Sequence, residues 1–314
     1  MELERQRVVA LAGGVGGARL AHGLAQNLTP EDLTVIVNTA DDFEWLGLTV
    51  CPDIDTVLYT LAGVEDPKEG WGRAGDTMYT LDALGRMGGP TWFRIGDADL
   101  ATHLMRSQQL WQSLSLSEVT RSLAATLGVQ QTVLPMTDDE MQTRVLTDEG
   151  DLAFQEYFVR RACEPRVLGF RFDGLDTAQA SDAVLGALEA AELIIVCPSN
   201  PYVSIDPILS LPGVRERIRA RPSVAVSPII GGAAVKGPAA KMMRELGLDP
   251  CAAEIARHYS GLVRGIIIDT VDAGQAETIQ ASGMRAGTAA SLMRDAAGRA
   301  ALARVALDFG RGLR

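Results

Sequence analysis

A glycine-rich segment near the start of the chain, Gly13–Gly17, has the composition of a phosphate-binding loop. Glycine tolerates positive φ and close backbone approach, so the N–H groups of such a loop can face a phosphate at the start of a helix. No Gly-Lys-Ser/Thr follows, which excludes a Walker A loop, and Arg19 stands where a dinucleotide fingerprint needs a small residue. A tight turn without a ligand is the alternative interpretation. We predict phosphate contacts from Gly13, Gly14, Gly16 and Gly17.

Two adjacent carboxylates, Asp41 and Asp42, follow the next run of β-branched residues. Neighbouring carboxylates repel each other unless a cation or a set of donors neutralises them, and Mg²⁺ commonly takes one or two carboxylates together with phosphate oxygens. We therefore predict a Mg²⁺ site and a catalytic site here, and the choice between base and metal ligand stays open. A solvated turn rich in Asp and Asn is the alternative.

Three further motifs carry charged groups that suit ligand binding or structure equally. Asp53 and Asp55 stand where a helix is expected to begin, and capping of that helix is the plain interpretation. Arg94 stands beside two aromatic residues and can pair with an aspartate of the following helix or present a planar fork to a ligand. His103, within that helix, is expected to be a packing residue.

Two later segments rich in proline and glycine also follow expected strands. Ser199 and Asn200 supply neutral donors and acceptors of the kind that contact a nucleobase or ribose. Lys236 supplies a point charge for phosphate. For each segment, a simple loop connection is the competing interpretation.

The elements that position these groups follow one pattern. Short β-branched runs without polar alternation, typical of strands buried on both faces, occupy residues 8–12, 33–37, 193–197, 223–227 and 266–268. Helical patterns intervene, which predicts an α/β fold with a doubly wound, mostly parallel, Rossmann-like sheet. Ligands of such sheets bind at the carboxyl ends of the strands, where the motifs above lie.

The regular alternation of expected strands and helices is interrupted between residues 65 and 171. We predict a smaller, largely helical insertion there that contributes to the substrate cleft, and a nucleotide-binding core formed by residues 1–64 and 172–314. Residues 131–134 and 142–147 are expected to form a strand pair that extends the edge of the sheet.

Composition excludes several classes of protein. The 314 residues include 29 basic and 40 acidic side chains, and the formal net charge of −11 disfavours binding to nucleic acid or anionic lipid. Four cysteines without a Cys-x-x-Cys pair suggest neither a zinc site nor a disulfide framework. No apolar run is long enough for a signal peptide or a membrane span, so a cytoplasmic protein without membrane partners is expected.

Taken together, the motifs resemble the 2-phospho-L-lactate transferase family of coenzyme F420 biosynthesis. The resemblance covers nearly the whole chain, with similar blocks in the same order at 13–19, 38–42, 52–59, 94–103, 135–139, 198–205 and 226–241. It implies a Mg²⁺-dependent transferase of small molecules. Such an enzyme moves a 2-phospholactyl, phosphoenolpyruvyl or phosphoglyceryl group from a guanosine-diphosphate-linked donor to the ribityl hydroxyl of the deazaflavin Fo, and GMP leaves.

The resemblance also implies roles for individual residues. Asp55 and Arg94 would bind Fo, and replacement of Asp55 by alanine is expected to weaken Fo binding with the fold intact. Asp41, Asp42 and Asp269 would help to hold the metal. The guanosine diphosphate part would contact the glycine loop together with Asn38, Ser199, Asn200 and Lys236.

Two other functions compete with this interpretation. One is a nucleotide-sugar-binding regulatory protein of the same fold without transferase activity, whose acidic motif usually continues into Gly and Ser, unlike the Phe43 and Glu44 found here. The other is an NAD-dependent oxidoreductase, disfavoured because Asn38 stands where a ribose-binding acid is expected. The sequence leaves the phospho-acid open, and a homodimer is expected only as the commonest soluble assembly.

Overall fold

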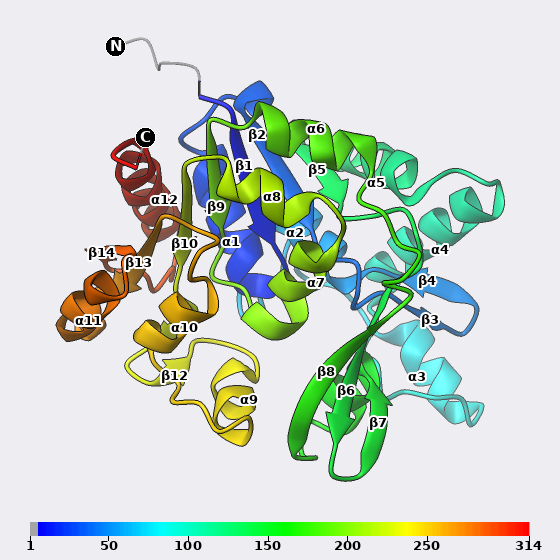
Figure 1. Ribbon diagram of the computed structural model, residues 1–314. Coiled ribbons are helices and arrows are strands. Elements are labelled where there is room, and N and C mark those ends of the chain that lie inside the picture. Colours follow the sequence, from blue (N-terminus) through cyan, green and yellow to red (C-terminus); the bar gives the residue numbers. More distant parts are fainter. Residues whose placement is uncertain (1–5, 314) are drawn as a thin grey trace.

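A computed structural model describes residues 6–313 and shows an α/β fold built on one large parallel sheet (Figure 1). All the pairings within this sheet are parallel, as predicted for β-branched runs without polar alternation. The sheet has seven strands in the order β14 (Arg285–Ala289), β13 (Gly265–Asp269), β10 (Ser223–Val226), β9 (Leu193–Val196), β1 (Val8–Ala12), β2 (Leu33–Val37) and β5 (Thr132–Pro135). The predicted doubly wound, Rossmann-like class is confirmed.

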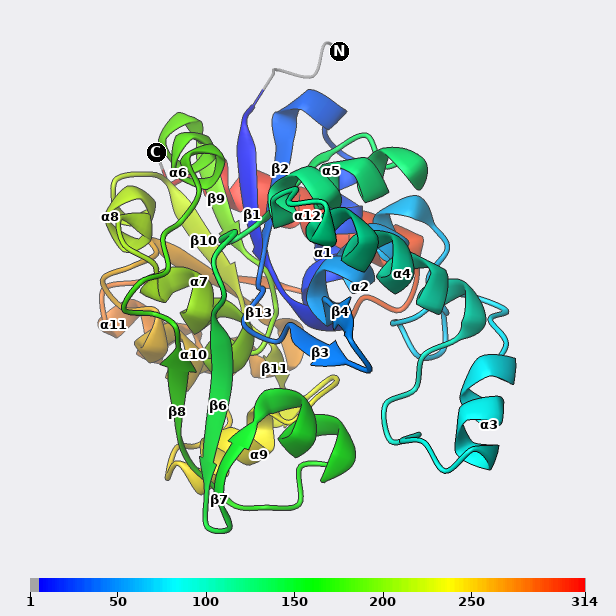
Figure 2. The ribbon, with the colours of Figure 1, turned by 90° about the vertical axis from the view of Figure 1, so that its right-hand side faces the viewer.

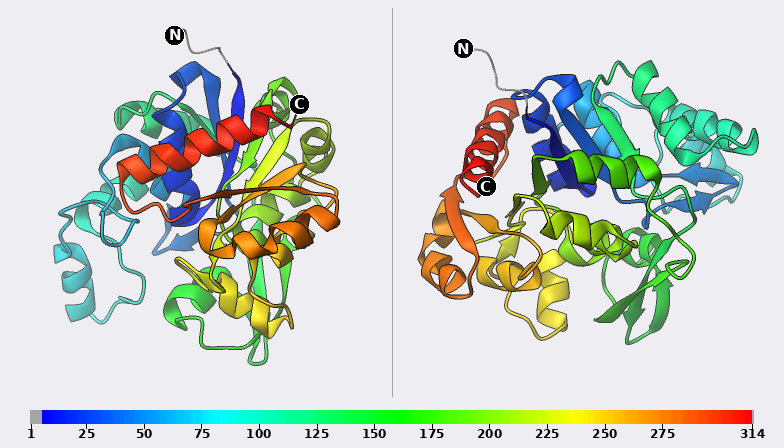
Figure 3. Two further views of the ribbon diagram at one scale, coloured as in Figure 1. Left: turned by 90° about the vertical axis from the view of Figure 1, so that its left-hand side faces the viewer. Right: turned by 45° about the horizontal axis from the view of Figure 1, so that its top comes forward.

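Helices cover both faces of the sheet because alternate residues of each strand point to opposite sides. Val8, Ala10 and Ala12 of β1 face a layer that includes α1 (Gly14–Ala25), α2 (Pro52–Ala62) and α12 (Ala296–Arg311). Figure 3 shows α12 lying across this face. Val9 and Leu11 face the opposite layer, which contains α6 (Asp182–Ala190), α7 (Asp206–Ser210), α8 (Val214–Arg219), α9 (Ala239–Glu245), α10 (Ala252–His258) and α11 (Ala276–Ala281).

The chain winds outward from β1 in both directions. On one side β2 and then β5 follow, and on the other side β9, β10, β13 and β14 follow. The strand order therefore reverses between β1 and β9, and a crevice at the carboxyl ends of these two strands is where open α/β sheets bind ligands. The glycine-rich segment after β1 and the Pro198–Ser204 segment after β9 meet at this point.

The segment 65–171 is helical in its first half and forms strands in its second half. Its helices are α3 (Tyr79–Arg86), α4 (Asp97–Trp111) and α5 (Leu116–Thr126). The expected pairing of residues 131–134 with 142–147 is wrong. The first of these segments joins the main sheet beside β2, whereas β6 (Gln142–Thr147) pairs with β7 (Gly150–Ala153) and β8 (Val167–Asp173) in a separate antiparallel sheet. The division into a core and an insertion stays a prediction.

Figure 2 shows α3 and the β6–β8 sheet below the carboxyl ends of the central strands. Two reciprocal caps tie α3 to α4: Asp97 accepts backbone N–H groups at the start of α3, and Asp76 accepts them at the start of α4. The Thr77 hydroxyl also donates to Asp97, and this bond, more than the backbone bonds, lowers the pKa of Asp97 below its ordinary value. The caps fix the segment that carries Arg94 and leads into α4.

The remaining elements are short. They comprise two hairpins, β3 (Phe43–Trp45) with β4 (Leu48–Val50) and β11 (Ile229–Ile230) with β12 (Ala233–Ala234), and the 3-10 or π-helical segments η1 (Pro30–Asp32), η2 (Glu156–Arg160), η3 (Pro201–Ile205) and η4 (Thr270–Gln275). Among the described residues, no helix is long and apolar enough to span a membrane.

Candidate active site

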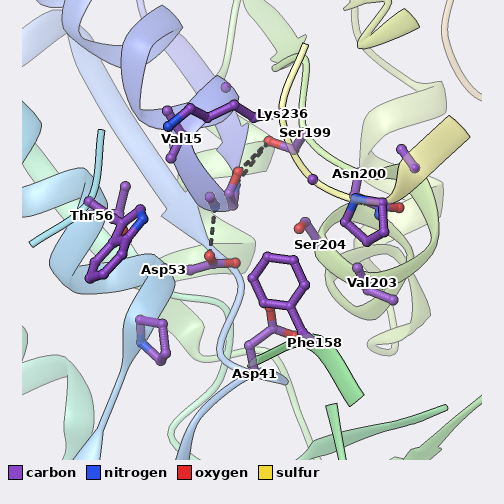
Figure 4. Close-up of a pocket in the computed structure, with 18 of the residues that line it drawn as sticks. Val15, Asp41, Asp53, Thr56, Phe158, Ser199, Asn200, Val203, Ser204 and Lys236 are labelled. Atoms are coloured by element: carbon purple, nitrogen blue, oxygen red, sulfur yellow. Dashed lines mark hydrogen bonds between the residues drawn. The ribbon is translucent and has the colours of Figure 1, made fainter. Parts of the chain in front are cut away.

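A cavity of about 520 Å³ opens at the carboxyl ends of the central strands (Figure 4). Its walls come from segments far apart in the sequence, which follow β1, β2, β9 and β10 or belong to α2, α4, η2 and the β11–β12 hairpin. The cavity is lined by nine of the residues expected to contact ligands: Gly13, Gly14, Gly16, Asp41, Asp55, Arg94, Ser199, Asn200 and Lys236.

The glycine loop forms the first turn of α1. Gly14 has a φ of 59°, a conformation that glycine adopts without strain. A Cβ on Gly16 would collide with the backbone carbonyl of Pro198. Glycine is therefore needed where the segment after β1 packs against the segment after β9. The Gly13 N–H donates to Ser199 Oγ at 3.1 Å, and the Ser199 hydroxyl donates back to the Gly13 carbonyl at 2.8 Å. Ser199 therefore fixes the loop, and Gly17 lies behind it, outside the lining.

Asp53 occupies the N-terminus of α1 instead of capping its own helix. Helix α2 already begins at Pro52, so Asp53 and Asp55 lie within its first turn, and the expected capping role is wrong. Asp53 Oδ1 accepts from the Gly14 N–H at 2.7 Å, and Oδ2 accepts from Asn38 Nδ2 at 3.0 Å. The positive end of a helix favours a carboxylate at this place. Asn38 thus supports the site from behind and does not line the cavity.

Asp41 and Asp53 form a buried carboxylate pair in the cavity wall (Figure 4). Burial raises the pKa of Asp41 well above its ordinary value, and the nearby Asp53 carboxylate raises it further. Burial also raises the pKa of Asp53 to about 6, although its bonds to Asn38 and Gly14 oppose this change. Within the described chain, Asp41 Oδ1 is buried without a hydrogen-bond partner. An unpartnered oxygen beside a second carboxylate fits a hard divalent cation such as Mg²⁺.

This pair predicts how metal-free stability depends on pH. Because the pKa of Asp53 is higher in the folded protein than in the unfolded chain, its contribution is fully present below about pH 4 and is lost as pH rises through about 6. A divalent cation held by this pair would bind the deprotonated carboxylates, so stabilisation by added Mg²⁺ is expected to be larger at about pH 7.5 than at about pH 5. Thermal unfolding with EDTA or Mg²⁺ across this range measures both effects, and an equal Mg²⁺ shift at the two pH values would contradict the assignment.

Two of the predicted metal ligands lie outside the cavity lining. Burial raises the pKa of Asp42, whose side chain hydrogen-bonds with the Cys51 thiol. Both Asp269 oxygens are engaged: Oδ2 accepts from the backbone and hydroxyl of Ser291 at 2.7 and 2.9 Å, and Oδ1 accepts from Val271 N at 3.0 Å. The structure therefore shows Asp269 anchoring Ser291, which follows β14 and itself lines the cavity.

Asp55 faces the cavity but is also bound to a buried arginine. The Arg106 side chain is fully buried, and its guanidinium contacts both Asp55 oxygens, with Nη1 3.0 Å from Oδ2. Burial by itself would lower the pKa of Arg106, but the Asp55 carboxylate raises it above its ordinary value. The expectation that Asp55→Ala leaves the fold intact is therefore revised, because that change would strand a buried cation.

Arg94 and Lys236 lie on the cavity wall with different partners. The guanidinium carbon of Arg94 lies 6.0 Å from the centroid of the Trp71 ring, a distance compatible with cation–π attraction. Lys236 Nζ donates to the backbone carbonyls of Lys68, at 3.4 Å, and Glu69.

Asn200 has a structural role at the cavity wall. Its Oδ1 atom accepts from the backbone N–H of Tyr202 at 3.1 Å. Asn200 thereby caps the N-terminus of η3.

The structure adds lining residues that the sequence interpretation did not assign to the site. Asp53 was considered only as a capping residue of the helix that follows it. Its contact with the first turn of α1 depends on the fold and could not be predicted from local sequence. Phe154 and Phe158 stack with centroids 5.4 Å apart at η2, and Trp71, Trp92 and Phe93 line another part of the cavity. Aromatic residues of this kind suit a planar ligand, yet no regular spacing in the sequence connects the two groups.

The fold and the site together define a doubly wound α/β protein with a ligand cavity at the switch point of its sheet. Residues 8–300 match the family model described as 2-phospho-L-lactate transferase CofD. The chain belongs to this family, as the motifs predicted, and it is a transferase.

Curated relatives agree with this assignment. The chain is 43% identical to a phosphoenolpyruvate transferase of Streptomyces griseus, with 98% of this chain and 99% of the relative covered. It is 38% identical to a 2-phospho-L-lactate transferase of Methanosarcina acetivorans, with 91% and 93% covered. Among solved structures, a UPF0052 family protein of Bacillus halodurans aligns with a TM-score of 0.64 at 17% identity, covering 97% of this chain and 99% of that chain. The last similarity concerns the fold alone.

Proposed function

We propose that this transferase moves a phosphoenolpyruvyl group from a guanosine-diphosphate-linked donor to the ribityl hydroxyl of the deazaflavin Fo, with release of GMP. One comparison supports the choice of phospho-acid: relatives named phosphoenolpyruvate transferase are 40–43% identical to this chain, and relatives named 2-phospho-L-lactate transferase are 37–38% identical. The observation that carries the proposal is the Asp41–Asp53 carboxylate pair beside the first turn of α1. This arrangement suits a diphosphate with its cation.

The reaction needs one bond to form and one to break. The ribityl oxygen attacks the phosphorus that carries the acid, the bond from that phosphorus to the bridging oxygen breaks, and GMP leaves with the electron pair. Asp41 and Asp53 would hold Mg²⁺, which when bound neutralises charge on the diphosphate. The backbone of Gly16, in the first turn of α1, approaches the same region and can orient phosphate oxygens, whereas the Gly14 N–H already donates to Asp53. The hydroxyl proton would pass to a carboxylate of the pair, which lines the same cavity.

The acceptor would occupy the part of the cavity between α2 and α4. Asp55 of α2 and Arg94, which precedes α4, line the cavity, and the Trp71 ring near Arg94 can stack on a flat heterocycle. The nucleotide would lie toward Ser199 and Asn200 at the end of β9. In this placement the reacting groups of donor and acceptor meet beside Asp41 and Asp53.

Fluorescence titration with Fo, with and without GDP and Mg²⁺, tests the proposal. We expect saturable Fo binding, followed by formation of product when the three GDP-linked phospho-acids are supplied in turn. Turnover with the lactyl donor alone would replace phosphoenolpyruvate by phospholactate and leave the acceptor assignment standing. Absence of Fo binding under all conditions, together with binding of a UDP-sugar, would overturn the proposal in favour of a nucleotide-sugar-binding protein.

A further inference from the structure

Arg19 is a half-buried cation of the cavity wall whose hydrogen-bond donors are mostly unused. It lies in the second turn of α1, and its Nη1 atom donates to the Met293 carbonyl at 3.4 Å. Within the described chain, its Nε atom is buried without a hydrogen-bond partner. A guanidinium offers five N–H donors, so Arg19 keeps donors for a ligand in the cavity.

The carboxylate near Arg19 already pairs with a second arginine. Arg299 Nη1 lies 3.0 Å from Glu65 Oε1, and the two side chains are 10% and 11% exposed. Burial and the charge of Arg299 both lower the pKa of Arg19, and Glu65 opposes this change only in part. Two arginines therefore share one carboxylate, which leaves a positive charge at the cavity wall uncompensated.

Arg19 lies on a different side of α1 from the segment that follows β9. Arg19 and Val15 are four residues apart, so they share one face of the helix, and both line the cavity. A Cβ on Gly70 would lie 2.7 Å from a Val15 methyl and 3.3 Å from Arg19 Nη2. Gly16, in contrast, packs against Pro198. The side of α1 that carries Arg19 is thus separate from the side toward which the nucleotide is proposed to lie.

A second cation borders the same part of the cavity. Lys236 Nζ donates to the backbone carbonyls of Lys68, at 3.4 Å, and Glu69. Figure 4 shows the Lys236 side chain extending toward Val15 of α1. Carbonyl groups are neutral, so the charge of Lys236 adds to that of Arg19. The two cations make this part of the wall attractive to an anionic group of a ligand.

We propose that Arg19 binds the carboxylate of the phospho-acid that this enzyme transfers. The inference rests on the proposed function and deepens it, because each of the three candidate phospho-acids carries a carboxylate. The planar fork of an arginine matches the two oxygens of such a group. Helix side chains tilt toward the N-terminus, so Arg19 reaches back toward the first turn, where the diphosphate is proposed to lie. With the guanosine on the Pro198 side, the acid at the other end of the diphosphate lies on the Arg19 side.

The test compares two ligands that differ only in this carboxylate. They are the lactyl ester of GDP and its propan-2-yl ester, in which a methyl group replaces the carboxylate. By calorimetry without Fo, the original protein should bind the lactyl ester about 10- to 100-fold more tightly. Arg19→Met keeps an unbranched side chain beside Val15 and removes the charge. This variant should bind the two esters within roughly threefold of each other and bind GDP as the original protein does.

Arg299→Met is the matched control, because Arg299 is a neighbouring cation that does not line the cavity. It should retain the preference for the lactyl ester. Its ligand-free melting temperature should fall, since the buried Glu65 loses its cation. Arg19→Met should not lower the melting temperature, because Arg19 makes only a long hydrogen bond to Met293 among the described residues.

The ratio of the two ester affinities decides the inference. Equal binding of the esters by the original protein, or an unchanged ratio in Arg19→Met, would overturn it while leaving the proposed function standing. An equal loss of affinity for GDP and for both esters in Arg19→Met would also overturn it, because Arg19 would then bind the diphosphate. Failure of the original protein to bind GDP and both esters would instead remove the proposed function and this inference with it.

Discussion

Replacing Asp41 with asparagine should lower kcat by about 100-fold or more, a loss typical of removing a group that carries charge or a proton in the reaction. The same change should raise the melting temperature of the metal-free protein. Burial and the neighbouring Asp53 carboxylate both disfavour the charged form of Asp41, so the neutral amide removes a repulsion within the fold. Activity and stability are thus expected to move in opposite directions.

The matched control for this prediction is Asp42→Asn. Asp42 is adjacent in the sequence and half-buried, but it lies outside the cavity lining and bonds with Cys51. Steady-state kinetics at saturating Mg²⁺ and thermal unfolding in EDTA measure the two effects. A loss of kcat in Asp42→Asn as large as that in Asp41→Asn would contradict the assignment of the metal site to Asp41 and Asp53.

Replacing Arg106 with leucine should destabilise the protein by about 3–5 kcal/mol, because it leaves the buried Asp55 carboxylate without its cation. The Arg106 side chain is 0% exposed and that of Asp55 is 7% exposed, so solvent cannot replace the lost partner. The double change Arg106→Leu with Asp55→Leu should recover most of this loss, since an apolar pair carries no unpaired charge. Urea unfolding gives the free energy of unfolding of the original protein, of Arg106→Leu and of the double variant.

The surface pair Arg144–Asp151 provides the comparison. Its side chains are 25% and 32% exposed and its atoms lie 2.8 Å apart. Arg144→Leu should cost at most about 1 kcal/mol, because water and salt screen an exposed pair. Equal losses in the two arginine variants would show that the Arg106 pair is screened as well, and that Asp55 is free to act on its own.

Much of the fold follows from local patterns in the sequence. The strands at 8–12 and 33–37 were predicted with the bounds that the structure shows, because a run of β-branched residues buried on both faces needs no information beyond the run itself. The strand with which a given strand pairs cannot be predicted in this way. Residues 142–147 form a strand, yet their partners are β7 and β8, and an alternating pattern does not specify which strand lies alongside.

The candidate site divides in the same way. The sequence by itself determined which residue types stand at the strand ends, such as the glycine loop after β1 and Asp41 after β2, since parallel strands bring their carboxyl ends to one edge. Only the tertiary structure decided that Asp53 caps α1 and that Arg106, 51 positions further along the chain than Asp55, pairs with it. These contacts join separate helices, and their energies depend on burial and on the distance between charges, which no local spacing of residues encodes.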